Sequence, residues 1–182
     1  MDQTSMDLMK AVIDKYNLAD KAVVDVGSLD INGTYRSLFT GKYTGADMDV
    51  GPNVDVLIGS SKWGKISNVD AVISGQMLEH VANIPALMAE IMRILKPGGI
   101  VSIIVPSRGP RHDHPIWVGN FEPEQLASII TDAGFELLSI DRDFTLPWYL
   151  VTGVGRKPAT ISNNKVESRS VKSKSGIAGD DE

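Results

Sequence analysis

Apolar residues recur at helical intervals in three long segments of the chain. The first, residues 4–17, presents one apolar face made of Met6, Met9, Val12, Ile13 and Tyr16. Residues 85–99 repeat the pattern, and Lys96 in the last turn, followed by Pro97 and two glycines, predicts where that helix stops. A third helix is predicted to begin at residue 122, and a short one near Thr34.

Seven short segments between these helices are rich in apolar or β-branched residues and are predicted strands. They are residues 22–26, 42–47, 54–59, 70–74, 100–106, 135–141 and 147–155. Strands that alternate with helices predict a doubly wound, mostly parallel α/β sheet with helices on both faces. The gap at residues 48–53 is too short for a crossover helix. One face of the sheet is therefore expected to be thinly covered there, and a partner subunit, as in a homodimer, could cover it.

Length and charge limit the classes of protein to which this chain can belong. The chain has 182 residues, 42% of them apolar, which is enough to fill the core of one domain. We expect that domain over residues 1–155, and a flexible polar tail without aromatic residues over 156–182. A net charge of −5 makes nucleic acid an unlikely partner. Without cysteine, a long apolar run or a secretory-signal pattern, the sequence predicts a cytoplasmic protein with no metal site and no membrane partner.

Polar residues and glycines stand at the ends of several predicted strands, which meet at one edge of a parallel sheet, where ligands bind. Gly27 lets a ligand approach the backbone closely, but the run from Gly27 to Gly33 lacks the glycine spacing of a dinucleotide site. The carboxylates of Asp25 and Asp30 are poor neighbours for phosphate and suit a cationic amino group. Asp47, after the next strand, is placed to accept both hydroxyls of a ribose.

Each of these residues also has a purely structural interpretation. Asp25 would cap a tight turn, and Asp47 would lie in a surface turn. Taken together, however, the two strand ends point to a nucleoside that carries an amino-acid group and no phosphate. S-adenosylmethionine fits that description.

Five stretches, in order over residues 20–142, carry a more specific resemblance: "VVDVGS", "YTGADM", "DAVISGQMLEHV", "EIMRILKPGGIVSIIVPSRGP" and "FEPEQLASIITDAGFELLSI". With "LEHV" followed about fifteen residues later by "LKPGG", the chain resembles a small, single-domain class I S-adenosylmethionine-dependent methyltransferase. The resemblance implies a Rossmann-like seven-stranded sheet with its last strand antiparallel. The implied cofactor is S-adenosyl-L-methionine, lying across the ends of strands one, two and four.

The resemblance also assigns cofactor roles to residues of this chain. The implied cofactor-binding residues are Asp25, Gly27, Ser28, Asp47, Met48, Ser60, Gly75 and Gln76. Asp25 and Gly27 would hold the methionine portion, Asp47 the ribose and Met48 the adenine face. Two features depart from the family pattern: Leu29 stands where many relatives have a second glycine, and "GSS" at 59–61 replaces an acidic residue that contacts the adenine amino group.

The long loop at 107–120 is the predicted substrate region, because long loops in compact domains often bind ligands. Candidate general bases are His112 and His114, and candidate substrate-binding residues are Arg108, Arg111 and Trp117. A solvated surface loop is the alternative. His80 is expected to be structural, and Trp148 and Tyr149 belong either to the acceptor pocket or to the core.

The sequence leaves three functions in competition. The first is methyl transfer to a small or modest-sized acceptor, with an oxygen, nitrogen or carbon nucleophile. The second is a catalytically silent S-adenosylmethionine-binding regulatory or partner subunit, which the irregular first loop favours. The third, a nicotinamide dinucleotide oxidoreductase, is disfavoured by the missing phosphate-binding glycines.

Overall fold

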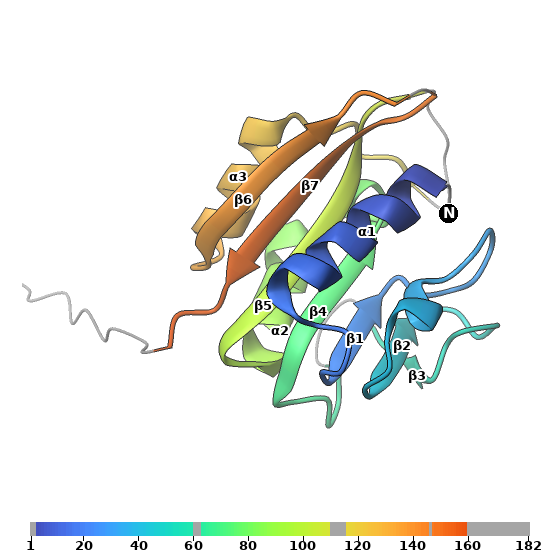
Figure 1. Cartoon of the computed structure of the whole chain (residues 1–182), viewed down its shortest axis with the longest axis vertical. Helices are drawn as coiled ribbons and strands as arrows, with labels where there is room; N and C mark the ends of the chain where they lie inside the picture. Colours follow the sequence, from blue (N-terminus) through green and yellow to red (C-terminus); the bar gives the residue numbers. More distant parts are fainter. Residues whose placement is uncertain (1–2, 60–62, 110–115, 146, 160–182) are drawn as a thin grey trace, which may run out of the picture.

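A computed structural model describes residues 3–59, 63–109, 116–145 and 147–159. They form one seven-stranded sheet in the order β3-β2-β1-β4-β5-β7-β6 (Figure 1). The strands are β1 (Val23–Val26), β2 (Tyr43–Asp47), β3 (Val56–Leu57), β4 (Val69–Gly75), β5 (Leu95–Arg108), β6 (Glu136–Asp143) and β7 (Tyr149–Arg156). Strands β1 to β5 pair in parallel, whereas β7 is antiparallel to both β5 and β6. The predicted fold, with its last strand antiparallel, is confirmed.

Helices cover both faces of the sheet, as predicted (Figure 1). They are α1 (Gln3–Tyr16), α2 (Ile84–Ile94), α3 (Pro123–Asp132) and the short 3-10 helices η1 (Tyr35–Leu38) and η2 (Leu78–His80). Met9 and Ile13 of α1 belong to a buried cluster on one face, and Met88 of α2 and Leu126 of α3 belong to a cluster on the other. The helix residues that the apolar spacing selected in the sequence are therefore residues of the core.

The predicted stop of the second helix is wrong by two residues. The helix α2 ends at Ile94, and Leu95 already pairs with Val69 in the sheet. Lys96 lies in β5 rather than in a last helical turn, and its Nζ bonds to Asp70 of β4 at 2.5 Å. Pro97 disfavours the helical conformation at the residue before it, so the chain turns into the strand early.

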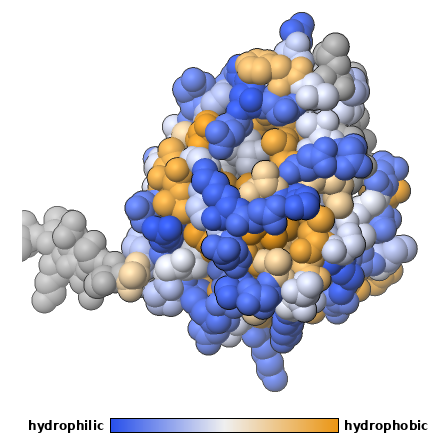
Figure 2. Space-filling model, in the orientation of Figure 1, coloured by the Kyte–Doolittle hydropathy of each residue, from blue (hydrophilic) through white to orange (hydrophobic). Residues whose placement is uncertain are grey.

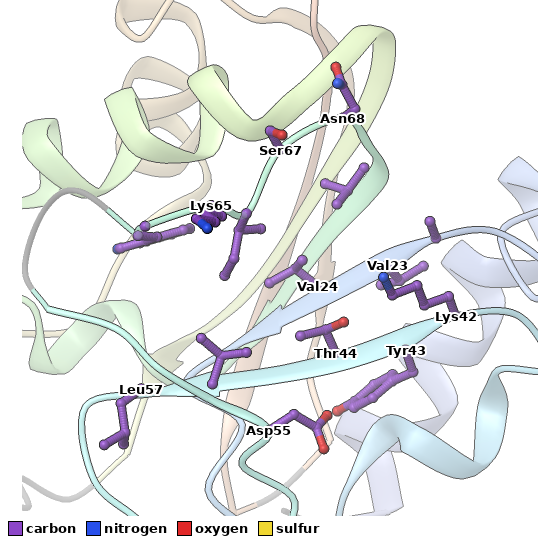
Figure 3. A pocket seen from close by; sticks show the side chains of 16 residues that line it. Val23, Val24, Lys42, Tyr43, Thr44, Asp55, Leu57, Lys65, Ser67 and Asn68 are labelled. Carbon is purple, nitrogen blue, oxygen red and sulfur yellow. The ribbon is translucent and has the colours of Figure 1, made fainter.

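The sheet edge at β3 is thinly covered, as expected from the short gap after β2. The predicted strand at 54–59 is reduced to two paired residues, Val56 and Leu57, with Leu57 57% exposed. The described part of the connection from β3 to β4 contains no helix either. A hollow of about 640 Å³ therefore opens over β1, β2 and β3, as Figure 3 shows, with Val24 and Lys65 among its lining residues. That a second copy of the chain covers this face stays a prediction.

A single helix, α1, spans the middle of the opposite face. A helix is about 10 Å wide, whereas seven strands extend over roughly 29 Å, so one helix cannot cover them all. Figure 2 accordingly shows apolar side chains at the surface beside α1. Within the described ranges, no helix is both long enough and apolar enough to cross a bilayer.

The predicted domain boundary falls at the end of β7, whose last residue is Arg156. Lys157 continues beyond it and its Nζ donates to the carbonyls of Met92 and Leu95, both at 2.7 Å. The rest of the predicted tail, from residue 160, lies outside the described residues.

Close packing of α3 on β7 gives a first testable prediction. A Cβ built at Gly153 lies 2.6 Å from Ile130 Cδ1, and one built at Gly155 lies 2.8 Å from Ile130 Cγ2. We expect Gly153→Ala to lower the free energy of unfolding by about 1–3 kcal/mol through overpacking. The substitution Ile130→Val removes Cδ1 but keeps Cγ2, so it should reduce the cost of Gly153→Ala and not that of Gly155→Ala. Denaturant unfolding of the two double-mutant cycles measures this, and equal rescue in both cycles would contradict it.

Candidate functional site

The carboxyl ends of β1, β2 and β4 meet at one edge of the sheet. Asp25 of β1 is paired with Gly45 of β2 on one side and with Ile73 of β4 on the other. The residues that follow these three strands therefore stand next to one another. This juxtaposition brings together the predicted cofactor residues Gly27, Ser28, Asp47, Gly75 and Gln76.

The loop after β1 bends over the end of β2. Gly27 has a φ of +79°, in the left-handed region that favours glycine, and its N–H donates to the carbonyl of Ala46 at 2.9 Å. The N–H of Leu29 then donates to Asp47 Oδ2 at 2.9 Å. The loop is thus held by the Asp47 carboxylate at the position where relatives place a second glycine.

Asp47 is half-buried and firmly oriented. Besides the bond from Leu29, its Oδ1 accepts the N–H of Asp49 at 3.2 Å. Each carboxylate oxygen has two lone-pair sites, so each can accept one further hydrogen bond. Met48 beside it is 68% exposed and offers an apolar surface at the same edge. The arrangement can accept two neighbouring hydroxyls next to a flat apolar group.

Asp25 is buried below this edge, with 2% of its surface exposed. The hydroxyl of Tyr43 donates to its Oδ2. Burial raises the pKa of Asp25 to about 7, although the hydrogen bond from Tyr43 opposes that change; the nearby Asp47 charge raises it further and Arg36 lowers it. The carboxylate therefore contributes a charge beneath the site that depends on pH near neutrality.

A polar network connects Asp25 to the loops around it. The Asn53 side-chain amide donates to Tyr43 Oη at 3.1 Å and to the Ser28 carbonyl at 2.8 Å. Arg36 Nε donates to Asn53 Oδ1 at 2.7 Å, and the guanidinium lies 4.4 Å from the centre of the Tyr43 ring. Arg36 also forms an ion pair with Asp55 at 2.6 Å. Three loops are thereby fixed to the end of β1.

Gly75 and Gln76, predicted to line the sulfonium side, lie at the end of β4. A Cβ built at Gly75 would come within 2.1 Å of Tyr35 Oη, so only glycine admits the buried Tyr35 ring. The Tyr35 hydroxyl is 2.5 Å from Ser5 Oγ, which connects α1 to this edge. Gln76 has a φ of +53°, a conformation uncommon outside glycine. This backbone bend directs the chain away from the sheet just past Gly75.

Glu79 and His80 follow in the 3-10 helix η2. The Glu79 side chain is fully buried, neither carboxylate oxygen has a hydrogen-bond partner among the described residues, and burial raises the pKa of this carboxyl to about 7. His80 Nδ1 lies 2.6 Å from the carbonyl of Ile116, and the Val118 N–H donates to the Glu79 carbonyl at 2.8 Å. His80 thus anchors the segment that leads to α3, which agrees with the structural role expected of it. Among the described residues, no group of three or more potential metal ligands occurs.

The substrate predictions are only partly covered by the described residues. Ser60, Arg111, His112 and His114 lie outside them. Arg108 is exposed at the end of β5, and its guanidinium lies 5.6 Å from the centre of the Tyr149 ring. The Trp117 ring centre is 6.0 Å from that of His80. Trp148 packs against the buried cluster on the α1 face, whereas Tyr149 stays at the rim.

Sequence reasoning did not single out Tyr43, Asn53, Arg36 or Glu79 as site residues. Tyr43 begins a strand and Asn53 lies in the turn "GPN", where its φ is +69°. Neither position carries a local sign that its side chain reaches Asp25. Tyr43 and Glu79 did lie within the quoted motifs "YTGADM" and "LEHV", but neither motif revealed that the Tyr43 hydroxyl reaches Asp25 or that Glu79 is buried.

The buried Glu79 carboxylate generates a pH-dependent prediction. Its pKa near 7 exceeds the value of 4.5 for an unperturbed glutamate, so between these values the folded chain holds a proton that the unfolded chain has lost. The contribution of Glu79 to the free energy of unfolding is therefore fully present below about pH 4.5 and is lost as pH rises to about 7. Relative to the native chain, Glu79→Gln should gain on the order of 2–3 kcal/mol between pH 5 and pH 8.

Thermal and denaturant unfolding across that pH range measure the effect. Glu124→Gln, which removes an exposed carboxylate of α3, is the matched control. A pH trend that is the same in both variants would show that burial of Glu79 is not the cause.

Comparison with known proteins finds that the chain is similar to methyltransferases in sequence and in fold. A family model described as a methyltransferase domain matches residues 16–103, from the end of α1 into β5. A probable S-adenosylmethionine-dependent methyltransferase from Mycolicibacterium smegmatis is 29% identical over 77 residues. That match covers 39% of this chain, and the chain spans only 30% of that relative's length.

Two solved structures share the fold at low identity. A Burkholderia thailandensis 1,6-didemethyltoxoflavin-N1-methyltransferase, solved with 1,6-didemethyltoxoflavin and S-adenosylhomocysteine, has a TM-score of 0.69 and 19% identity over 86% of this chain and 80% of its own. The second comes from a complex between the Haloferax volcanii Trm112 methyltransferase activator and a putative methyltransferase. It has a TM-score of 0.58 and 18% identity, over 85% of this chain and 96% of that one. With the strand order and the motifs, these matches confirm the predicted resemblance to class I S-adenosylmethionine-dependent methyltransferases.

Proposed function

We propose that this chain transfers a methyl group from S-adenosylmethionine to a small or modest-sized acceptor. The observation that carries the proposal is the end of β2, where the oriented Asp47 carboxylate keeps a free lone pair on each oxygen beside the exposed Met48. A ribose with an adjoining flat base matches that pair of features. The net charge of −5 supports a modest acceptor over a nucleic acid.

The residues at this edge fit the cofactor in chemistry as well as in position. Asp25, Asp30 and Asp47 make the β1 and β2 ends acidic, which suits a cationic amino-acid group and disfavours a pyrophosphate. Gly27 exposes its backbone at the bend of the loop. When bound, S-adenosylmethionine supplies a methyl group already activated by a sulfonium, so much of the protein's contribution is orientation.

Within this proposal each side chain has a distinct task. Asp47 would accept the two ribose hydroxyls, and Met48 would cover the adenine. Asp25, buried and bonded to Tyr43, would act through its charge and through the network that fixes the loop. Ser28, Gly75 and Gln76 would line the amino-acid and sulfonium side, and Ser60 the adenine edge.

The acceptor end of the proposal rests on the segment after β5. Arg108, Arg111 and Trp117 are proposed to hold the acceptor. His112 or His114 is proposed to remove a proton where the nucleophilic atom carries one that must leave. The silent partner subunit, the alternative drawn from the sequence, would bind the cofactor without turnover. Transfer of a radiolabelled methyl group to a panel of small acceptors distinguishes the two.

Calorimetric titration with S-adenosylhomocysteine tests the cofactor site directly. Asp47→Asn should weaken binding by about tenfold or more, because one of the two acceptor oxygens for the ribose hydroxyls becomes a donor and the remaining hydrogen bond loses its charge assistance. Asp49→Asn removes the same charge from the same turn and should leave affinity nearly unchanged. Equal affinities for the two variants in folded protein would contradict the assignment of Asp47.

Titration of Asp25 gives a second prediction. Its pKa of about 7 means that the carboxylate gains its charge as pH rises through neutrality. Binding of the cationic S-adenosylmethionine should therefore tighten between pH 6.0 and pH 7.5, by up to about tenfold per pH unit below the pKa. In Asp25→Asn this dependence should disappear. A pH profile that the substitution does not change would remove Asp25 from the binding energetics.

A further inference from the structure

Two aromatic rings and two guanidinium groups cluster where β5 ends and the β6–β7 connection turns. The rings of Phe144 and Tyr149 meet edge to face, with centres 5.4 Å apart and planes at 77°. The Arg108 guanidinium lies 5.6 Å from the centre of the Tyr149 ring, and that of Arg142 lies 5.7 Å from the centre of the Phe144 ring. We call these four residues the aromatic–arginine cluster. No part of the predicted cofactor site belongs to it.

The two arginines differ in how their charge is balanced. Arg142 forms an ion pair with Glu122, the N-cap residue of α3. Arg108 forms no ion pair with any residue that the structure describes. The nearby Asp143 carboxylate accepts the N–H of Thr145 at 2.8 Å and forms no ion pair with either arginine among the described residues. Among the residues that the structure describes, Arg108 is therefore the arginine of the cluster without an ionic partner.

Phe144 is the second unusual feature, because 64% of its surface is exposed. Its edge-to-face contact with Tyr149 stabilises one orientation of the ring. An exposed ring held in a fixed orientation beside a cation offers a face on which another flat group can stack.

The cluster lies on the same edge as the cofactor site but further along. Gly75 at the end of β4 is paired with Ile104 of β5, and Arg108 comes four residues later. At about 3.3 Å per residue, Arg108 projects roughly 13 Å beyond Gly75 along the strand direction. Since β4 and β7 lie on opposite sides of β5, a carboxylate held by Arg108 would stand between the proposed sulfonium side and the exposed ring of Phe144.

We propose that the aromatic–arginine cluster is the acceptor subsite and that the methyl acceptor is an aromatic acid. Its carboxylate pairs with the guanidinium of Arg108, and its ring covers the exposed Phe144 beside Tyr149. A guanidinium fork matches the two oxygens of a carboxylate, which a neutral alcohol cannot replace. A single uncompensated cation suits one carboxylate better than a polyphosphate. This inference rests on the proposed function, and it specifies the substrate class for the same site.

Calorimetric titration of the full chain, first saturated with S-adenosylhomocysteine, tests the subsite. The probes are benzoate, 4-hydroxybenzoate and 2-naphthoate, with benzyl alcohol as the uncharged control. We expect at least one acid to bind about tenfold or more tightly than benzyl alcohol. The preference should be lost in Arg108→Gln, and Phe144→Ala should weaken acid and alcohol alike. Arg156→Gln, which replaces a half-buried arginine at the opposite end of β7, should bind all four probes as the native chain does.

The outcomes test the aromatic-acid subsite and the proposed methyltransferase function separately. If S-adenosylhomocysteine binds and none of the acids does, the aromatic-acid subsite is overturned while the methyltransferase proposal stands. Equal acid affinity in Arg108→Gln and Arg156→Gln likewise overturns it. If S-adenosylhomocysteine itself does not bind, the proposed function fails. Titration of the same acids without it then still shows whether Arg108 forms an anion site.

Discussion

The buried carboxylate of Asp25 is the constraint on which the cofactor edge depends. A carboxylate that has lost its water requires hydrogen bonds, and Tyr43 provides one from the neighbouring strand. Asn53 bonds to Tyr43 and to the Ser28 carbonyl, and Arg36 holds Asn53. The position of the loop after β1 is thus set by side chains from η1, β2 and the turn before β3. Satisfying one buried charge aligns most of the groups that face the ligand.

The same region has little helical cover. The short connections around β2 and β3 leave the hollow of Figure 3 over the first three strands, with Trp63 buried beside it. Hydrogen bonds replace some of the missing packing: Asp70 accepts the N–H of Ala22 at 3.0 Å and pairs with Lys96, so the starts of β1, β4 and β5 are held together. The amino ends of these strands therefore stay aligned with fewer elements packed behind them.

Charge is distributed unevenly along that edge. The ends of β1 and β2 carry Asp25, Asp30 and Asp47, whereas the end of β5 carries Arg108 without an ionic partner among the described residues. A cationic cofactor and an anionic acceptor would be attracted to opposite ends of one edge. Their reacting groups would then meet near Gly75, between the two charged regions. The separation follows from strand order, since β4 lies between β1 and β5.

The sequence by itself determined the strands, the three long helices and the gathering of polar strand ends at one edge of the sheet, because apolar periodicity and the strand-end residues are local properties. It was wrong about the end of α2, where Pro97 and the pairing of Leu95 with Val69 end the helix early. Only the tertiary structure brought Tyr43, Asn53 and Arg36 to Asp25, and Phe144 and Arg142 to Arg108. Those contacts join residues from separate elements, and no local pattern specifies which strands become neighbours. The physical reason is that burial and charge compensation are set by what surrounds a residue in space.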